Sequence, residues 1–104
     1  MKEGWFIGAF LPTALHTEQF EVAYKKHKAG EVWPEHYQRK ATEVNLLVSG
    51  VIRIGEQMLY AGDIFTVFPM EPIKPEFNTN VALVVVKTQS LPGENVLGRP
   101  SSPV

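Results

Sequence analysis

A chain of 104 residues has the length of one domain, and 44% hydrophobic residues with a net charge of -1 are typical of globular proteins. Ten basic residues are balanced by eleven acidic ones, which disfavours a dedicated nucleic-acid-binding protein, because such proteins gain affinity by neutralising phosphates. The sequence contains no cysteine, which excludes disulfides, thiolate metal sites and cysteine nucleophiles. We therefore expect a single domain over residues 1–104.

An apolar stretch at residues 5–11 is slightly similar to a secretory signal. Glu3 reduces the positive charge in front of it, Pro12 interrupts it, and no small-x-small cleavage pattern follows. We therefore expect a first strand that packs on the core, in a cytoplasmic protein. No apolar run approaches the roughly 18 residues that a membrane helix needs, so no membrane partner is expected.

Strand patterns dominate the chain after this point. Residues 20–25 alternate large apolar with polar or small side chains, which is the period of a half-buried strand. Further short segments are rich in β-branched or aromatic residues, at 42–49, 51–54, 57–60, 63–68 and 81–89. Glycine-containing pairs separate consecutive segments, as tight hairpins require, at Ser49-Gly50, Gly55-Glu56 and Gly62-Asp63. No segment shows a helical period, so the sequence predicts an all-β antiparallel barrel or sandwich.

Prolines predict an irregular loop and a tail. Pro69, Pro72 and Pro75 recur at three-residue spacing, and a regular hydrogen-bonded ladder cannot run through them. Residues 91–104 are rich in proline, glycine and serine, a composition that predicts a C-terminal tail. The valine-rich run at 81–86, together with an exposed sheet edge, favours a homodimer.

Residues 30–78 resemble the two sequence motifs of the cupin family. The first motif falls on Gly30, His36, Gln38, Glu43 and Gly50, with Gln38 in place of its second His. The second motif falls on Gly62, Pro69, Glu71, Lys74 and Asn78, with Glu71 in place of Gly and Lys74 in place of His. The resemblance implies a cupin domain, an antiparallel double-stranded β-helix or jelly-roll barrel.

In metal-bearing cupins, two His and the Glu of the first motif hold a divalent ion with the His of the second. This sequence keeps His36 and Glu43, and Gln38 offers an amide oxygen as a weaker ligand. Residues 36 and 38 of one strand face the same side, so both side chains are expected inside the barrel. The resemblance thus implies either no cofactor or one iron, manganese, nickel or zinc ion at His36, Gln38 and Glu43.

Lys74 decides between these alternatives in the sequence. A protonated lysine has no lone pair, so beside Glu43 it would repel a divalent ion and pair with the carboxylate. A barrel without metal is therefore the first interpretation. If the proline-rich loop folds differently, Glu71 or Glu76 would reach the site instead and give an oxygen-rich set that suits manganese or iron.

Our first hypothesis is a barrel that binds a small polar ligand, namely a sugar, a sugar derivative or a carboxylate. The expected polar contacts are His36, Gln38, Glu43 and Lys74. Trp33 and Tyr37 are expected near the pocket mouth, where aromatic faces stack on sugars or flat ligands.

Two other hypotheses stay open. The first is a metal-dependent enzyme, either an isomerase or epimerase of a sugar or keto acid, or an oxygenase, with Glu43 or Lys74 moving a proton. The second is an assembly module with a vestigial pocket. Five basic and two acidic residues lie between Tyr24 and Lys40, but a solvated strand face explains this excess better than a nucleic-acid site does.

Overall fold

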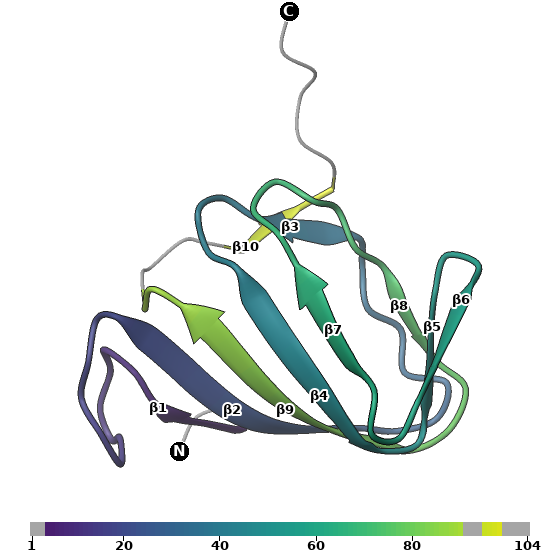
Figure 1. Ribbon diagram of the computed structural model, residues 1–104, viewed down its shortest axis with the longest axis horizontal. Helices are drawn as coiled ribbons and strands as arrows, with labels where there is room; N and C mark the ends of the chain where they lie inside the picture. The colour runs from purple at the N-terminus through teal and green to yellow at the C-terminus, as the bar shows by residue number, and fades with distance from the viewer. Residues whose placement is uncertain (1–3, 91–94, 99–104) are drawn as a thin grey trace, which may run out of the picture.

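The chain folds into ten strands in three sheets over residues 4–90 and 95–98, which are the residues that the computed structural model describes (Figure 1). The strands are β1 (Trp5–Ile7), β2 (Phe20–His27), β3 (His36–Gln38), β4 (Glu43–Ser49), β5 (Val51–Ile54), β6 (Gln57–Tyr60), β7 (Ile64–Val67), β8 (Pro75–Phe77), β9 (Val81–Thr88) and β10 (Asn95–Leu97). Every strand pairing is antiparallel, which confirms the predicted all-β class. No helix in the described part of the chain is long and apolar enough to cross a membrane.

The larger sheet has five strands in the order β1-β2-β9-β4-β7. Its central pair is in register with Leu47 opposite Leu83 and Asn45 opposite Val85. Because side chains alternate along a strand, these residues share one face, which is the buried one, and Val44 and Leu46 share the exposed face. The large apolar side chains Val44 and Leu46 thus face outward while Asn45 faces inward, so the alternation predicts a strand here but not which of its faces is buried.

The smaller sheet has three strands in the order β6-β5-β8, and it packs on the buried face of the larger sheet. The core contains residues of both sheets: Ala23, Leu47, Ile52, Leu59, Phe77, Val81, Leu83 and Val85. The predicted hairpin glycines have positive φ, and Gly50 in the turn between β4 and β5 has φ of 91°. A Cβ atom at Gly50 would lie 2.2 Å from the Asn80 carbonyl oxygen, so this turn requires glycine.

A two-stranded sheet of β3 and β10 lies across one end of the barrel, at the top of Figure 1. Residues 95–97, which the composition assigned to a tail, form β10 and pair with β3, Leu97 opposite His36. Residues 91–94 and 99–104 of the predicted tail lie outside the described residues. On its other side β3 is held at Ile73, where His36 N donates to Ile73 O at 3.0 Å and Ile73 N donates to His36 O at 2.8 Å. These contacts fix the strand that carries His36 and Gln38.

Candidate functional site

A cavity of about 80 Å³ lies inside the barrel under β3. Its apolar side is formed by residues of the five-stranded and the three-stranded sheet, among them Ile52, Phe77, Leu83 and Val85. Its polar side carries side chains from four strands: His36 and Gln38 on β3, Glu43 and Asn45 on β4, Lys25 on β2 and Lys87 on β9. Several water molecules fit in this volume, since one needs roughly 10–15 Å³.

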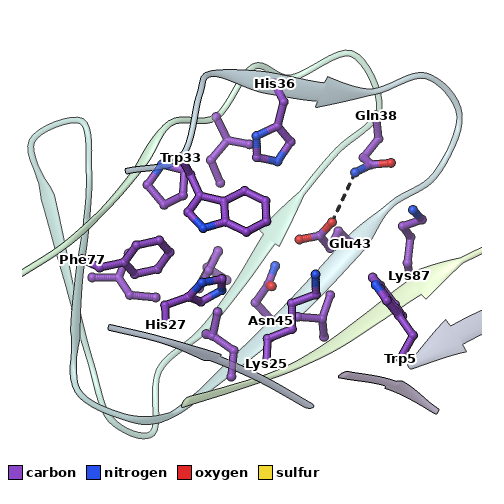
Figure 2. Close-up of a pocket in the computed structure, with 16 residues that line it drawn as sticks. Trp5, Lys25, His27, Trp33, His36, Gln38, Glu43, Asn45, Phe77 and Lys87 are labelled. Atoms are coloured by element: carbon purple, nitrogen blue, oxygen red, sulfur yellow. Dashed lines mark hydrogen bonds between the residues drawn. The ribbon is translucent and has the colours of Figure 1, made fainter. Parts of the chain in front are cut away.

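Four of the predicted site residues meet in this cavity: His36, Gln38, Glu43 and Trp33 (Figure 2). Gln38 is 2% exposed, and its Nε2 donates a hydrogen bond to Glu43 Oε2 at 3.4 Å. The side chains come from two strands that are not paired with each other, so β3 must be held across the barrel end to bring them together.

Asn45 adds an amide that the sequence did not mark as a site residue. It is 2% exposed and follows Glu43 by two positions on β4, so both side chains face the cavity. Its Nδ2 has no hydrogen-bond partner among the described residues. A buried amide donor without a partner destabilises a fold by about 1–3 kcal/mol, which is unusual enough to need an explanation.

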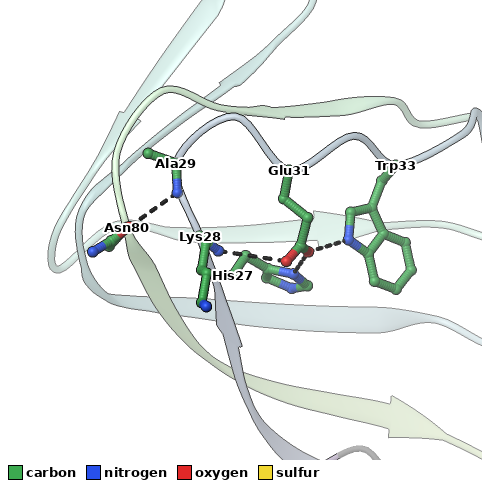
Figure 3. A network of polar contacts seen from close by, with 6 residues as sticks. All are labelled: His27, Lys28, Ala29, Glu31, Trp33 and Asn80. Atoms are coloured by element: carbon green, nitrogen blue, oxygen red, sulfur yellow. Dashed lines mark hydrogen bonds and ion pairs between the residues drawn. The ribbon is translucent and has the colours of Figure 1, made fainter.

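Trp33 is held against the cavity by a carboxylate at the edge of the barrel (Figure 3). Trp33 Nε1 donates to Glu31 Oε2 at 2.5 Å, and His27 Nδ1 lies 2.5 Å from the same oxygen. The His27 ring stacks on Phe77 with 4.3 Å between ring centroids. The hydrogen bond from Trp33, followed by that from His27, lowers the pKa of Glu31 below its usual value.

Comparisons with known proteins identify the architecture. No protein-family model matches the sequence, and no curated protein matches it. An uncharacterised protein with a double-stranded β-helix domain from Klebsiella pneumoniae has a TM-score of 0.73 and 18% identity, over 84% of this chain and 76% of that chain. The DMSP lyase DddQ from Ruegeria pomeroyi has a TM-score of 0.72 and 17% identity, over 93% of this chain and 51% of the lyase. An RmlC-like cupin protein from Ralstonia eutropha has a TM-score of 0.61 and 16% identity, over 70% of this chain and 50% of that chain.

The fold is that of the cupins. The comparison confirms the barrel that the motif spacing implied, and identities this low carry the fold alone. The chain spans about half the length of the lyase and of the Ralstonia protein. Since one fold hosts many functions, the activity has to be argued from the cavity itself.

The second cupin motif does not reach the cavity in the predicted way. Ile73, Pro75 and Phe77 face inward, and alternation then turns Lys74 and Glu76 outward, where both are exposed. The prediction that Lys74 lies beside Glu43 is therefore wrong. The motif spacing assigns an inward position to Lys74, whereas its neighbours Ile73 and Pro75 take the inward positions.

Three other side chains named from the sequence also lie outside the cavity. Tyr37 stands between His36 and Gln38 on β3 and so faces the opposite side. Glu71 Oε1 accepts from Phe68 N at 3.3 Å in the proline-rich loop. Glu76 Oε2 lies 4.0 Å from Arg53 Nε on the outer surface. Neither carboxylate completes a set with His36.

The positive charge expected from Lys74 is supplied instead by Lys25 and Lys87. Lys87 is 7% exposed, and its Nζ lies 3.3 Å from Glu21 Oε1 on the neighbouring strand. A signal was present in the sequence for Lys87 alone, because it continues the apolar series Val81, Leu83 and Val85 at two-residue spacing, whereas Lys25 takes a polar position of the alternation at residues 20–25. Lysines at such positions are rarely buried without a paired group, so they mark a site.

A divalent metal fits this cupin cavity poorly. Across residues 4–90 and 95–98, no group of three or more His, Asp or Glu side chains could hold a metal ion. His36, Gln38 and Glu43 offer one nitrogen and two oxygen donors, but Gln38 turns its amide nitrogen towards Glu43. Lys25 and Lys87 bring two ammonium groups to the same cavity, which oppose a cation. The metal site therefore stays a prediction.

Proposed function

We propose that this cupin-fold chain binds a small polar molecule in the barrel cavity. The ligand class is a sugar, a sugar derivative or a carboxylate. His36, Gln38, Glu43 and Asn45 supply the polar contacts, and the Trp33 ring forms part of the wall. A cavity of about 80 Å³ suits a molecule of few heavy atoms, since pockets for drug-sized ligands measure roughly 300 Å³ or more.

The observation that carries this proposal is the Nδ2 atom of Asn45. A residue selected for packing at this position would be apolar, because Leu47 and Val85 surround it on the same face. No atom of residues 4–90 and 95–98 accepts from this buried donor, which we explain by an acceptor that comes from outside the chain. A polar group kept at a cost in stability is the usual sign of a functional site.

The variant Asn45→Leu tests this interpretation without knowledge of the ligand. Leucine has a similar volume and removes the unsatisfied donor, so the free energy of unfolding should rise by about 1 kcal/mol or more. Urea denaturation of the variant and the parent measures the difference. The matched control is Asn80→Leu, since Asn80 Oδ1 accepts from Ala29 N at 2.9 Å and its loss should destabilise. A clear loss of stability in Asn45→Leu would show that this amide serves packing.

Binding is measured directly by two-dimensional amide NMR with three probes, glycerol, D-ribose and acetate. At least one probe should shift the amide signals of residues that line the cavity, and Asn45→Leu should abolish the shifts. If none of the probes moves a cavity residue and Asn45→Leu destabilises, a vestigial cavity replaces the binding proposal.

A metal-dependent enzyme is the second proposal, because His36, Gln38 and Glu43 do converge in the cavity and one structural neighbour is a lyase. Elemental analysis of protein purified without a metal-affinity step decides it. About one iron, manganese, nickel or zinc ion per chain would favour the enzyme. No metal, and none taken up on soaking, would remove it.

We also propose a homodimer through the outer face of the five-stranded sheet. This face exposes neighbouring apolar side chains: Val44, Leu46, Val48, Ile64 and Val86. Adjacent exposed apolar residues on a soluble surface are typical of an interface. In light scattering, the parent should have the mass of two chains and Leu46→Lys that of one, with Met58→Lys on β6 as the unaffected control. A monomeric parent would contradict this assembly.

A further inference from the structure

The end of the cavity away from β3 is apolar except for one amide. Asn45 has Phe65 on β7 and Val85 on β9 as its direct cross-strand neighbours, and both of them line the cavity. Ile52 and Phe77 line it from the three-stranded sheet, with Phe77 across the cavity from Asn45 in Figure 2. The side chains of these four neighbours carry no polar atom. Asn45 Nδ2 thus offers one hydrogen bond in apolar surroundings, and it has no partner among residues 4–90 and 95–98.

These surroundings select the kind of acceptor that suits Asn45 Nδ2. A hydroxyl that accepted from it would bring its own hydrogen next to apolar side chains, and a buried polar hydrogen without a partner is unfavourable. A carboxylate would bury a charge against one neutral donor, which is more unfavourable still. A carbonyl oxygen accepts without donating, and the carbon atoms beside it suit an apolar wall. An acyl group therefore fits this end of the cavity.

Two ammonium groups stand against indole rings at one wall of the cavity (Figure 2). Lys25 Nζ lies 5.2 Å from the centre of the Trp5 ring and 5.6 Å from that of Trp33. Lys87 Nζ lies 5.5 Å from the centre of the Trp5 ring. Aromatic faces attract cations at such distances, so the rings help to fix where the positive charges stand.

The charges around the cavity balance in number. Among the described residues, the lining contains two ammonium groups, of Lys25 and Lys87, and one carboxylate, of Glu43. A second carboxylate belongs to Glu21, whose Oε1 lies 3.3 Å from Lys87 Nζ. An anion is therefore not needed to neutralise an excess of positive charge, and this balance favours a neutral ligand.

Acceptors gather at the end of the cavity next to β3. Glu43 Oε2 accepts from Gln38 Nε2 at 3.4 Å, and a carboxylate has further acceptor positions. His36 Nδ1 donates to the Pro34 carbonyl at 3.1 Å, which leaves Nε2 of the neutral ring as an acceptor. Glu43 and Asn45 are two positions apart on β4, which separates their Cα atoms by about 6.6 Å. A few atoms between a carbonyl and a hydroxyl cover this spacing.

We propose that the ligand is a neutral hydroxylated molecule that carries a short acyl group, such as an acetylated polyol. Its acyl carbonyl accepts from Asn45 Nδ2, and the adjoining methyl group packs against Phe65 and Val85. A hydroxyl at its other end donates to Glu43 or to His36 Nε2. The cavity of about 80 Å³ holds roughly five to eight water-sized groups, so the ligand has few atoms beyond these. This inference rests on the proposed binding function and narrows its ligand class to acylated polyols.

Four probes of nearly equal size test the assignment on the parent chain. Ethylene glycol monoacetate carries both groups, ethylene glycol monoisopropyl ether has a methyl group in place of the carbonyl oxygen, and propyl acetate has a methyl group in place of the hydroxyl. The fourth, γ-hydroxybutyrate, carries a carboxylate instead of the ester. Amide NMR titrations should rank the monoacetate first, roughly tenfold or more above each of the others, because they leave a polar group unpaired or bury a charge. Added salt should leave binding of the neutral monoacetate unchanged.

The variants Asn45→Leu and Asn78→Leu form a matched pair. Asn78 is exposed and does not line the cavity. Asn45→Leu removes the donor, so the isopropyl ether should then bind more tightly than the monoacetate, whereas Asn78→Leu should keep the ranking of the parent. An equal loss for both probes in Asn45→Leu would mean that Asn45 only shapes the cavity, and would overturn its hydrogen bond to an acyl group. If Asn45→Leu fails to fold, the ranking of the four probes on the parent chain decides the question.

Each alternative result overturns the acylated polyol in a defined way. Equal binding of the isopropyl ether would remove the carbonyl, and equal binding of propyl acetate would remove the hydroxyl. Tightest binding of γ-hydroxybutyrate, weakened by salt, would replace the acyl group with a carboxylate. In these cases, and where glycerol, D-ribose or acetate binds and the monoacetate does not, the proposed binding function survives. If none of these small molecules binds, the acylated polyol is overturned, and the stability of Asn45→Leu then decides the binding function separately.

Discussion

The two ends of the barrel interior differ although the same strands build both. Along β4 the inward residues change from Leu47 to Asn45 to Glu43, and along β9 they change from Leu83 to Val85 to Lys87. The hydrophobic end contains the large buried side chains, and the polar end contains the cavity. One sheet thus carries packed apolar side chains at one end and the polar cavity residues at the other, where the buried Nδ2 donor of Asn45 has no partner among the residues that the structure describes. Substitutions at the two ends should therefore have opposite consequences.

The largest expected effect is at the hydrophobic end. Leu47 is fully buried, and Leu47→Ala should lower the free energy of unfolding by about 2–5 kcal/mol, because it leaves a cavity in packed core. Chemical denaturation measures this. A loss below that of an exposed control such as Leu15→Ala would contradict the placement of the core at this end.

A second effect at the hydrophobic end comes from the turn between β4 and β5. Gly50→Ala should destabilise by about 1–3 kcal/mol, since alanine disfavours a φ of 91° and its Cβ meets the Asn80 carbonyl. Gly55→Ala is the control, because Gly55 also has positive φ but open space around a Cβ atom. Equal losses would mean that φ alone decides and that the close approach does not matter.

A pH-dependent part of the stability is expected from Glu31, whose carboxylate accepts the hydrogen bond from Trp33 Nε1. The pKa of Glu31 is lowered in the folded chain, so its ionised carboxylate stabilises the fold at pH values above the usual pKa of 4.5. This stabilisation is lost as the pH falls through the folded pKa. Glu31→Gln should therefore lower the melting temperature at pH 7, and the difference from the parent should vanish in acid. Glu56→Gln, on an exposed turn, should show no such difference. A difference that persists unchanged in acid would exclude the carboxylate as its source.

The smallest effect on stability and the clearest on binding is expected at β10. Val96→Pro removes a backbone donor opposite Tyr37 on β3, the strand that carries His36 and Gln38. Stability should fall by less than about 1 kcal/mol, because β10 adds little to the core, but whichever of glycerol, D-ribose and acetate binds the cavity should bind several-fold more weakly. Thermal melts and NMR titration measure the two quantities. Unchanged binding would mean that Ile73 alone positions β3.

The fold was predictable from the sequence because its signals are local. Alternation at residues 20–25 predicts β2, and β-branched or aromatic residues predict β4 and β9. Glycine at residues 50 and 62 predicts the turns, and none of these signals needs knowledge of tertiary contacts. A three-residue strand such as β10 offers too few residues for a period, and its pairing with β3 is made across most of the chain. Composition alone therefore predicts a tail there.

The site was predictable only in part, for a related reason. His36, Gln38 and Glu43 keep the spacing of a motif, and the structure brings them together. The cations depend on cross-strand register, which places Lys87 opposite Glu43 and Lys25 opposite Leu83, and no motif records that pairing. Lys74 lies between Ile73 and Pro75, which both line the cavity. An error of one residue in the position of the motif therefore moves the predicted side chain to the other face of the chain.

The two indole rings beside Lys25 have a practical consequence. The sequence contains two tryptophans, Trp5 and Trp33, and both line the cavity. All indole emission from this protein thus originates at one place, next to positive charge, and indole fluorescence is sensitive to nearby charge and polarity. A molecule that enters the barrel would change the colour or intensity of that emission without any added dye. The protein carries its own optical sensor of occupancy, and a library of small acids and polyols can be screened against it in a plate reader.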